Sequence, residues 1–198
     1  YISSLLSEYN IKEDLKSKAV DETDWLFIAN IALSLSKISK EPEKIIYLIK
    51  DAISSYEHYL DEKGKKLPVF TLFIDGNLRD EKILKSVTEK TEVYFITRIS
   101  PFLENKPVEV EELDTMIADS EFILMLVDNN VDEILSFELG LAYPGGKPVV
   151  LFVHGDLSNV NPIVSQAATI TQKLEYAITV LKLFSVIKSG EILEVGKE

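Results

Sequence analysis

Four acidic residues stand between two of the most apolar runs of the chain, in the stretch VDNNVDEILSFELGLAYPGGKPVVLFV at residues 127–153. They are Asp128, Asp132, Glu133 and Glu138. Glu138 falls inside the apolar segment FELGLA, where a carboxylate away from water needs a partner or a chemical role. A carboxylate held at a cleft can act as a nucleophile or as a general acid or base. The alternative is a partly exposed helix acid that pairs with a lysine.

Short apolar runs alternate with amphipathic segments around these acids. Near-continuous apolar runs, typical of buried parallel strands, occupy residues 69–76, 92–99, 122–128 and 148–155. Helical spacing of apolar residues occurs at 79–90, 110–120, 132–143 and 172–188. This repeated order of strand and helix predicts an α/β fold with a doubly wound, flavodoxin-like or Rossmann-like parallel sheet.

The predicted fold selects candidate site residues, because ligands of such sheets bind at the carboxyl ends of the strands. Asp75, Gly76, Arg98 and Asp128 stand at these ends, and Asp132 and Glu138 lie on or near the helix that follows the third strand. Some of them have simpler explanations. The segment IDGN can be a strand-ending turn, and Asp132 can be a helix cap. A lone arginine after a strand is weak support for a phosphate site.

The first 65 residues follow a different pattern. Residues 24–38 and 43–60 place apolar side chains at three- and four-residue spacing, which predicts helices, with Pro42 suited to the first turn of the second. The polar run DEKGKK at 61–66 is typical of a linker. We therefore expect a helical N-terminal unit at 1–65 and an α/β domain at 66–198.

Composition narrows the classes of partner. The 198 residues include 21 basic and 33 acidic side chains, and the net charge of −12 disfavours nucleic acids and anionic membrane surfaces. The apolar runs are too short to span a bilayer, and the N-terminus is too acidic for a signal peptide, so we expect a cytoplasmic protein. No motif predicts a cofactor or a metal site, since cysteine is absent and His58 and His154 have no second ligand at metal spacing.

The stretch IADSEFILMLVDNNVDEILSFELGLAYPGGKPVVLF resembles the core of the nucleoside 2-deoxyribosyltransferases and the related deoxynucleotide N-hydrolases. The shared features are an AD pair, an apolar strand that ends in Asp, an Asp six residues before Glu-Leu-Gly, and a GKPV entry to the next strand. The segment VNPIV at 160–164 resembles the asparagine-containing segment before the final helix of that family. The resemblance covers about residues 67–185.

This resemblance implies roles for individual residues. Glu138 would be the nucleophile that attacks the anomeric carbon of a deoxyribosyl group, and Asp114 the acid that handles the proton of the departing base. Asp132 would hold sugar or base. Asn161 would enter the active site of a neighbouring subunit, which implies a homo-oligomer. The expected partner is a small nucleoside or nucleotide, and the chemistry is that of a carboxylate attacking an oxocarbenium-like centre.

The chain also departs from the family pattern. Phe73 stands where the family places a tyrosine that orients the nucleophile, and Ile134 and Leu135 stand where a glycine is usual. These departures favour an alternative, a non-catalytic nucleotide sensor in which the helical N-terminal unit contacts a partner. A further alternative is a TIR-like domain, which uses a glutamate in a flavodoxin-like sheet to cleave NAD. Fold alone does not decide between them.

Overall fold

The computed structural model of the protein describes residues 29, 32–33, 42–129, 131–161 and 164–195. These residues fall into two compact units, one formed by residues 1–66 with 186–198 and the other by residues 67–185. The change of unit after Lys66 lies beside the predicted linker, whereas the end of the last helix, predicted as part of the α/β domain, belongs to the first unit. Most of the helix predicted at 24–38 lies outside the described residues.

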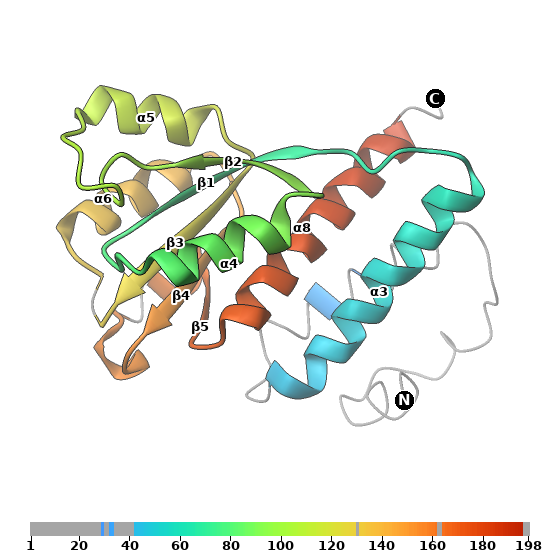
Figure 1. Ribbon diagram of the computed structural model, residues 1–198, viewed down its shortest axis with the longest axis horizontal. Coiled ribbons are helices and arrows are strands. Elements are labelled where there is room, and N and C mark those ends of the chain that lie inside the picture. The colour runs from blue at the N-terminus through green and yellow to red at the C-terminus, as the bar shows by residue number, and fades with distance from the viewer. Residues whose placement is uncertain (1–28, 30–31, 34–41, 130, 162–163, 196–198) are drawn as a thin grey trace. The chain divides into compact units, whose positions relative to one another are not determined.

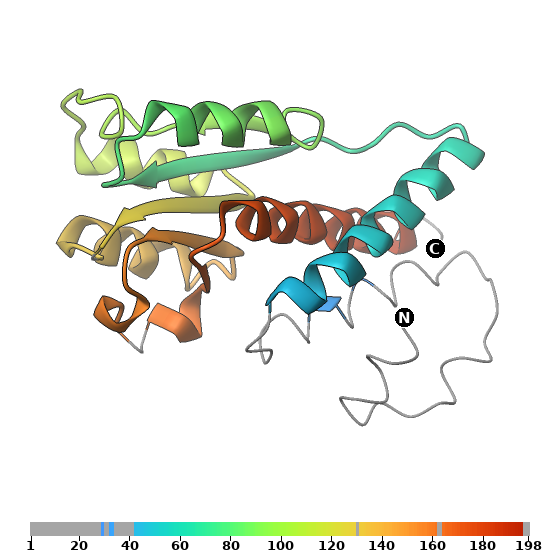
Figure 2. The same ribbon diagram turned by 60° about the horizontal axis from the view of Figure 1, so that its bottom comes forward.

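The second unit contains a five-stranded, fully parallel sheet (Figure 1). Its strands are β1 (Phe70–Gly76), β2 (Phe95–Ile99), β3 (Phe122–Asp128), β4 (Val149–His154) and β5 (Thr169–Thr171), in the order β2-β1-β3-β4-β5. The arrowheads of β1, β3 and β4 point to the same end of the unit in Figure 1 and in Figure 2. The predicted doubly wound α/β fold is confirmed, with β5 as a strand that the sequence patterns did not predict.

The helices that begin in this unit are α4 (Glu81–Thr91), α5 (Val110–Ala118), α6 (Glu133–Ala142), α7 (Val164–Ala167) and α8 (Leu174–Val195), with a short 3₁₀ turn η2 (Leu157–Asn159). From Val186 on, α8 belongs to the first unit. Side-chain caps fix where two of them begin. Asp80 accepts hydrogen bonds from the backbone N–H groups of Lys82 and Ile83 at the start of α4. Asp132 accepts from the N–H of Leu135 at the start of α6. These caps satisfy donors that the first turn of a helix leaves unpaired.

Alternate residues of the strands build two cores, one on each face of the sheet. On one face, Phe73, Met125 and their strand neighbours pack with apolar side chains of α5 and α6. On the other face, Phe122 contacts the rings of Phe70 and Phe95 and stacks on Phe184 of α8 at 6.5 Å between ring centroids. Figure 1 shows α4 and α8 in front of the strands and α6 behind them. Burial on both faces accounts for the near-continuous apolar runs of the strands.

The strand order places a topological switch point between β1 and β3. The chain leaves β1 for α4 on one face and leaves β3 for α6 on the other, so the two connections diverge there. Gly76 pairs with Leu126 at this end of the sheet and has φ +144°, and a Cβ on Gly76 would overlap the Leu126 carbonyl oxygen. Glycine is therefore required at 76 by the close approach of two strands.

The described part of the first unit consists mainly of α3 (Pro42–Glu62), which confirms the helix predicted at 43–60. Its buried side chains recur every three or four residues, from Ile45 to Leu60, while Tyr47 on the opposite side is 61% exposed. The helix is thus amphipathic, as its sequence pattern indicates. None of the helices formed by the described residues is both long and apolar enough to cross a bilayer.

Candidate functional site

Two buried carboxyl groups meet at the switch point. Asp75, on β1, and Glu138, on the sheet-facing side of α6, are each 0% exposed. Burial raises the pKa of Glu138 to about 10, and a hydrogen bond with Asp75 and the negative charges of Asp75 and Asp132 add to that shift. The buried position rules out the alternative of an exposed acid paired with a lysine. Glu138 therefore carries its proton at neutral pH.

Among the described residues, one backbone N–H is the only hydrogen-bond donor to the pair from outside it. The N–H of Gly76 donates to Oδ1 of Asp75 at 2.6 Å, but Oδ2 of Asp75 and both oxygens of Glu138 are buried without a donor. Two carboxylates can only accept hydrogen bonds, whereas one protonated carboxyl can donate to the other. The proton that Glu138 carries can be donated to an oxygen of Asp75, which gives the pair the donor it otherwise lacks.

Hydrogen bonds among Asn77, Asp128 and Asp132 connect the loops at the same end of the sheet. Asp132 caps α6 through Oδ1, at 2.9 Å from the Leu135 nitrogen, and accepts from Nδ2 of Asn77 through Oδ2 at 3.2 Å. Oδ1 of Asn77 in turn accepts from the backbone N–H of Asp128 at 2.7 Å. Asn77 therefore ties the loop after β1 to the loop after β3. The sequence patterns did not predict this role, whose only local signal is the turn IDGN.

Asp128 and His154 lie side by side at the ends of β3 and β4. They are partners in the strand register, and Nδ1 of His154 is 3.8 Å from Oδ1 of Asp128, which also accepts from Nδ2 of Asn129 at 2.9 Å. Both side chains are about half exposed or more. The predicted binding residue Asp128 thus lies on the open rim of the switch point. His154, interpreted from sequence as structural, is its neighbour.

Arg98 and Asp114 lie apart from the acid pair. Arg98 is exposed on the edge strand β2, and its Nη1 is 3.3 Å from Oδ2 of Asp119. Asp114 is exposed on α5, one residue after the buried Leu113. Among the described residues, no hydrogen bond or ion pair joins either side chain to Asp75 or Glu138.

The lysine of the GKPV motif, Lys147, has a structural role. Its Nζ donates to the backbone carbonyl oxygens of Ile117, Ala118 and Ser120 at 2.7, 2.6 and 2.6 Å. These carbonyls close the carboxyl end of α5, where a cation is stabilised by the unpaired acceptors and the helix dipole. The motif therefore has a structural role here, which is to fasten the start of β4 to the end of α5.

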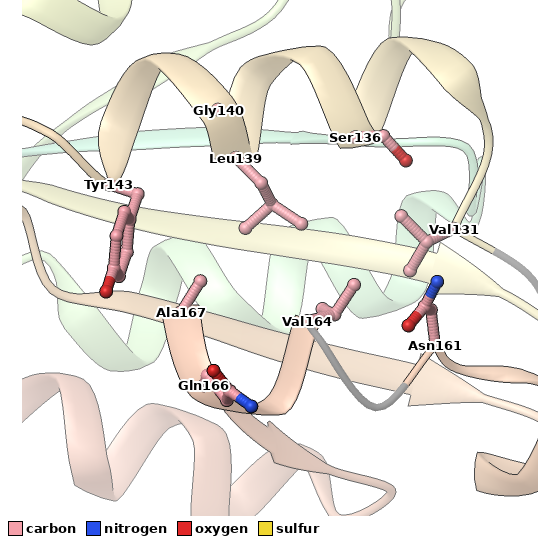
Figure 3. A pocket seen from close by; sticks show the side chains of 9 residues that line it. All are labelled: Val131, Ser136, Leu139, Gly140, Tyr143, Asn161, Val164, Gln166 and Ala167. Carbon is pink, nitrogen blue, oxygen red and sulfur yellow. The ribbon is translucent and has the colours of Figure 1, made fainter.

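Asn161 lines a cavity of about 490 Å³ on the other side of α6 (Figure 3). Ser136 and Gly140, each two residues from Glu138, also line it. Two residues correspond to a rotation of about 200° around a helix, so the cavity and the acid pair lie on opposite faces of α6. The structure thus gathers Asp75, Gly76, Asp128, Asp132 and Glu138 at the switch point, whereas Asn161 lines the cavity on the other face of α6, next to Val131.

Comparison of the chain with protein-family models, with curated proteins and with solved structures found no match. Within the part of the chain that the structure describes, no three His, Asp or Glu side chains are grouped to hold a metal ion.

Proposed function

We propose that the protein cleaves the N-glycosidic bond of a nucleoside or nucleotide, by transfer or hydrolysis, with Glu138 as nucleophile. The observation that carries this proposal is the buried Asp75–Glu138 pair at the switch point of a doubly wound sheet. Ligands of such sheets bind at this place. Strongly shifted pKa values at such a place favour a chemical role over a purely structural one.

The proton that Glu138 carries gives each member of the pair a task in this mechanism. Transfer of the proton from Glu138 to Asp75 leaves Glu138 as the carboxylate that attacks the anomeric carbon. An oxygen of Glu138 then bonds to this carbon, the N-glycosidic bond breaks, and its electron pair leaves with the base nitrogen, which takes the proton from Asp75. Water or a second base displaces the sugar from the ester, and a proton from that acceptor returns to the pair.

This mechanism assigns the proton to Asp75 in place of Asp114. The resemblance to the deoxyribosyltransferases implies Asp114, but that side chain is exposed on α5 and has no described contact with Glu138. Asp75 is near enough to Glu138 to help raise its pKa, which makes Asp75 the nearer proton carrier. A general acid must lie within hydrogen-bonding reach of the group it serves.

The mechanism also requires the loops to open, because both carboxyl groups are fully buried. The contacts that Asn77 makes with Asp132 and Asp128 hold the loops after β1 and β3 together. Substrate reaches Glu138 when these two hydrogen bonds break. Loop motions of this kind admit substrate and exclude water in many enzymes.

The test is a chromatographic search for released base. The full chain is incubated with deoxynucleosides, their 5′-monophosphates and NAD, next to Glu138→Ala and the matched control Glu133→Ala, which removes an exposed acid from the same helix. We expect release by the wild type and by Glu133→Ala, and none by Glu138→Ala. Full activity of Glu138→Ala would remove the nucleophile from the mechanism.

A second pair of variants separates the two candidate proton carriers. Loss of a general acid typically lowers the rate by ~100- to 10,000-fold. We expect that loss for Asp75→Asn and a near-normal rate for Asp114→Asn. The reverse result would restore Asp114 as the proton donor and leave Asp75 with the task of holding Glu138.

The full burial of Asp75 and Glu138 also supports a second candidate function, that of a non-catalytic nucleotide sensor. Phe73 offers no hydroxyl to orient Glu138, and no described donor stabilises Glu138 as a carboxylate. A protonated acid with a pKa of about 10 serves packing as well as it serves chemistry. Silence of the folded wild type across the whole panel would favour the sensor, and release of nicotinamide from NAD would favour a TIR-like reaction.

A further inference from the structure

The cavity beside α6 has an apolar interior. Val131, Leu139, Val164 and Ala167 contribute to its walls, from the start of α6, from α6 itself and from α7. Figure 3 shows the side chain of Leu139 directed from α6 towards Val164 and Ala167, with Tyr143 at one end of the cavity and Asn161 at the other. Its volume of about 490 Å³ lies within the range of small-molecule sites, roughly 300 to 1,000 Å³.

Gly140 leaves space in the wall of this cavity that the folded chain does not use. A Cβ added at Gly140 would meet no atom within 4 Å, in contrast to Gly76, where it would overlap a backbone carbonyl. Gly140 lies inside α6, where glycine costs about 0.5 to 1 kcal/mol relative to alanine. Gly140 is exposed, so glycine at this position leaves part of the cavity wall without a side chain and open to a ligand.

The lining carries no charge. The chain has 21 basic and 33 acidic residues, yet none of the nine described residues that line the cavity is Asp, Glu, Lys or Arg. Its polar groups are hydroxyls and amides, from Ser136, Tyr143, Asn161 and Gln166. Without a cation in the lining, a phosphate would lose hydration and gain no partner. An apolar body with neutral hydrogen-bonding groups fits this lining.

We propose that the cavity is a binding site for an uncharged heteroaromatic molecule of the size of a nucleobase or nucleoside. A flat ring lies against the apolar wall over Gly140 and contacts the ring of Tyr143, which is 62% exposed and available at the edge. The ring's own donors and acceptors meet the hydroxyl and amide groups. The site is separate from the acid pair, since it occupies the opposite face of α6, and its ligand class follows from the lining without reference to Glu138.

The experiment is a calorimetric titration of the full chain with 2′-deoxyadenosine, 2′-deoxycytidine and thymidine, and with their 5′-monophosphates. Wild type and Glu138→Gln are titrated in parallel, because Glu138→Gln prevents turnover without altering the cavity lining. Gly140→Leu fills the open space with a good helix former. Tyr143→Leu removes the ring, and Thr115→Leu, on the exposed side of α5, is the matched control because Thr115 does not line the cavity.

We expect at least one nucleoside to bind wild type and Glu138→Gln alike, and its monophosphate to bind at least tenfold more weakly. Gly140→Leu should weaken nucleoside binding at least tenfold and Tyr143→Leu several-fold, with Thr115→Leu within twofold of wild type. The proposal is overturned if no nucleoside binds, if Gly140→Leu binds as wild type does, or if a monophosphate binds as tightly as its nucleoside. Base release that persists in Gly140→Leu would leave the proposed function of Glu138 intact in each of these cases.

Discussion

Each face of α6 departs at one point from the usual arrangement of a surface helix, although Leu135, Leu139 and Ala142 pack in the core as expected. Its inner face carries Glu138, a titratable group that is fully buried against Asp75. Its outer face carries Ser136, Gly140 and Tyr143 around an open cavity whose described lining residues are uncharged. Helices on a sheet normally bury apolar residues and direct charge towards water. Both departures occur within one ten-residue helix, which makes α6 the part of the molecule that packing alone explains least.

The inner face of α6 lacks hydrogen-bond donors for its carboxyl groups, whereas the outer face lacks side-chain volume. On the inner face, Oδ2 of Asp75 and both oxygens of Glu138 have no donor among the described residues, so the proton that Glu138 carries is the hydrogen that the pair itself supplies. The outer face has satisfied backbone and empty space at Gly140. The contribution of the inner face to stability should therefore depend on pH, and that of the outer face on the volume of the side chain at position 140. Substitutions on each side should have effects of different kind and sign.

The largest expected effect comes from Gly76→Ala, next to Asp75 on the inner side. The added Cβ would overlap the Leu126 carbonyl, and φ +144° lies in a region that glycine alone occupies readily. We expect a loss on the order of 3 kcal/mol or more in the free energy of unfolding, measured by denaturant titration. Gly64→Ala is the control, because its φ is also positive but a Cβ there meets nothing within 4 Å. Equal effects of the two substitutions would contradict the close approach of β1 and β3.

Glu138→Gln should change how stability depends on pH. The pKa of Glu138 is about 10 in the folded chain and near its ordinary value, about 4.3, when unfolded. Between these values the folded state holds a proton that the unfolded state has released. The stability that Glu138 contributes is therefore complete below about pH 4.3 and falls as pH rises towards 10.

The amide that Glu138→Gln introduces cannot titrate, and its N–H can still donate to Asp75. We expect Glu138→Gln to match wild type near pH 4.5 and to exceed its free energy of unfolding at pH 8 by about 1 to 3 kcal/mol. Unfolding titrations at intervals from about pH 4.5 to 9 measure the difference between the two proteins. Parallel curves for wild type and variant would mean that Glu138 does not hold its proton in the folded state.

A smaller effect is expected for Asp132→Ala, which removes the cap that joins the start of α6 to Asn77. Loss of a helix N-cap costs about 0.5 to 2 kcal/mol. Asp80→Ala is the matched control, because Asp80 caps α4 in the same way. Only Asp132→Ala should also lower the pKa of Glu138, since the charge of Asp132 contributes to raising it. In unfolding titrations over the same pH range, the decline of stability with rising pH should end at a lower pH for Asp132→Ala than for Asp80→Ala. Identical pH profiles of the two cap variants would mean that Asp132 does not contribute to the raised pKa of Glu138.

The sequence predicted those features that depend on local pattern. Four of the five strands follow from apolar runs, and β3 has the predicted bounds because both of its faces are buried. β5 was missed because Thr169–Thr171 is short and has one apolar residue. Glu138 was singled out because a carboxylate in FELGLA conflicts with its neighbours. The role of Asn77 was not predicted, because its hydrogen-bond partner Asp132 is 55 residues away in the sequence. The cavity was not predicted either, since its walls come from α6 and from residues near 164 that only the fold brings together.

The smallest change in the free energy of unfolding is expected for Gly140→Ala. Its sign tests whether the cavity wall at Gly140 is open. Alanine restores helix propensity, and its methyl group meets no atom within 4 Å, so the free energy of unfolding should rise by about 0.5 to 1 kcal/mol. A gain would mean that the methyl group fits into the open space, so that the wall of the cavity at Gly140 is open as the structure describes it. A loss of stability would mean that the methyl group meets a neighbour, so that the wall is closed and the outer face differs from the inner one only in charge. Thermal and denaturant unfolding of the full chain measure the sign directly, with Ser136→Ala as a control that also lines the cavity but occupies no glycine position.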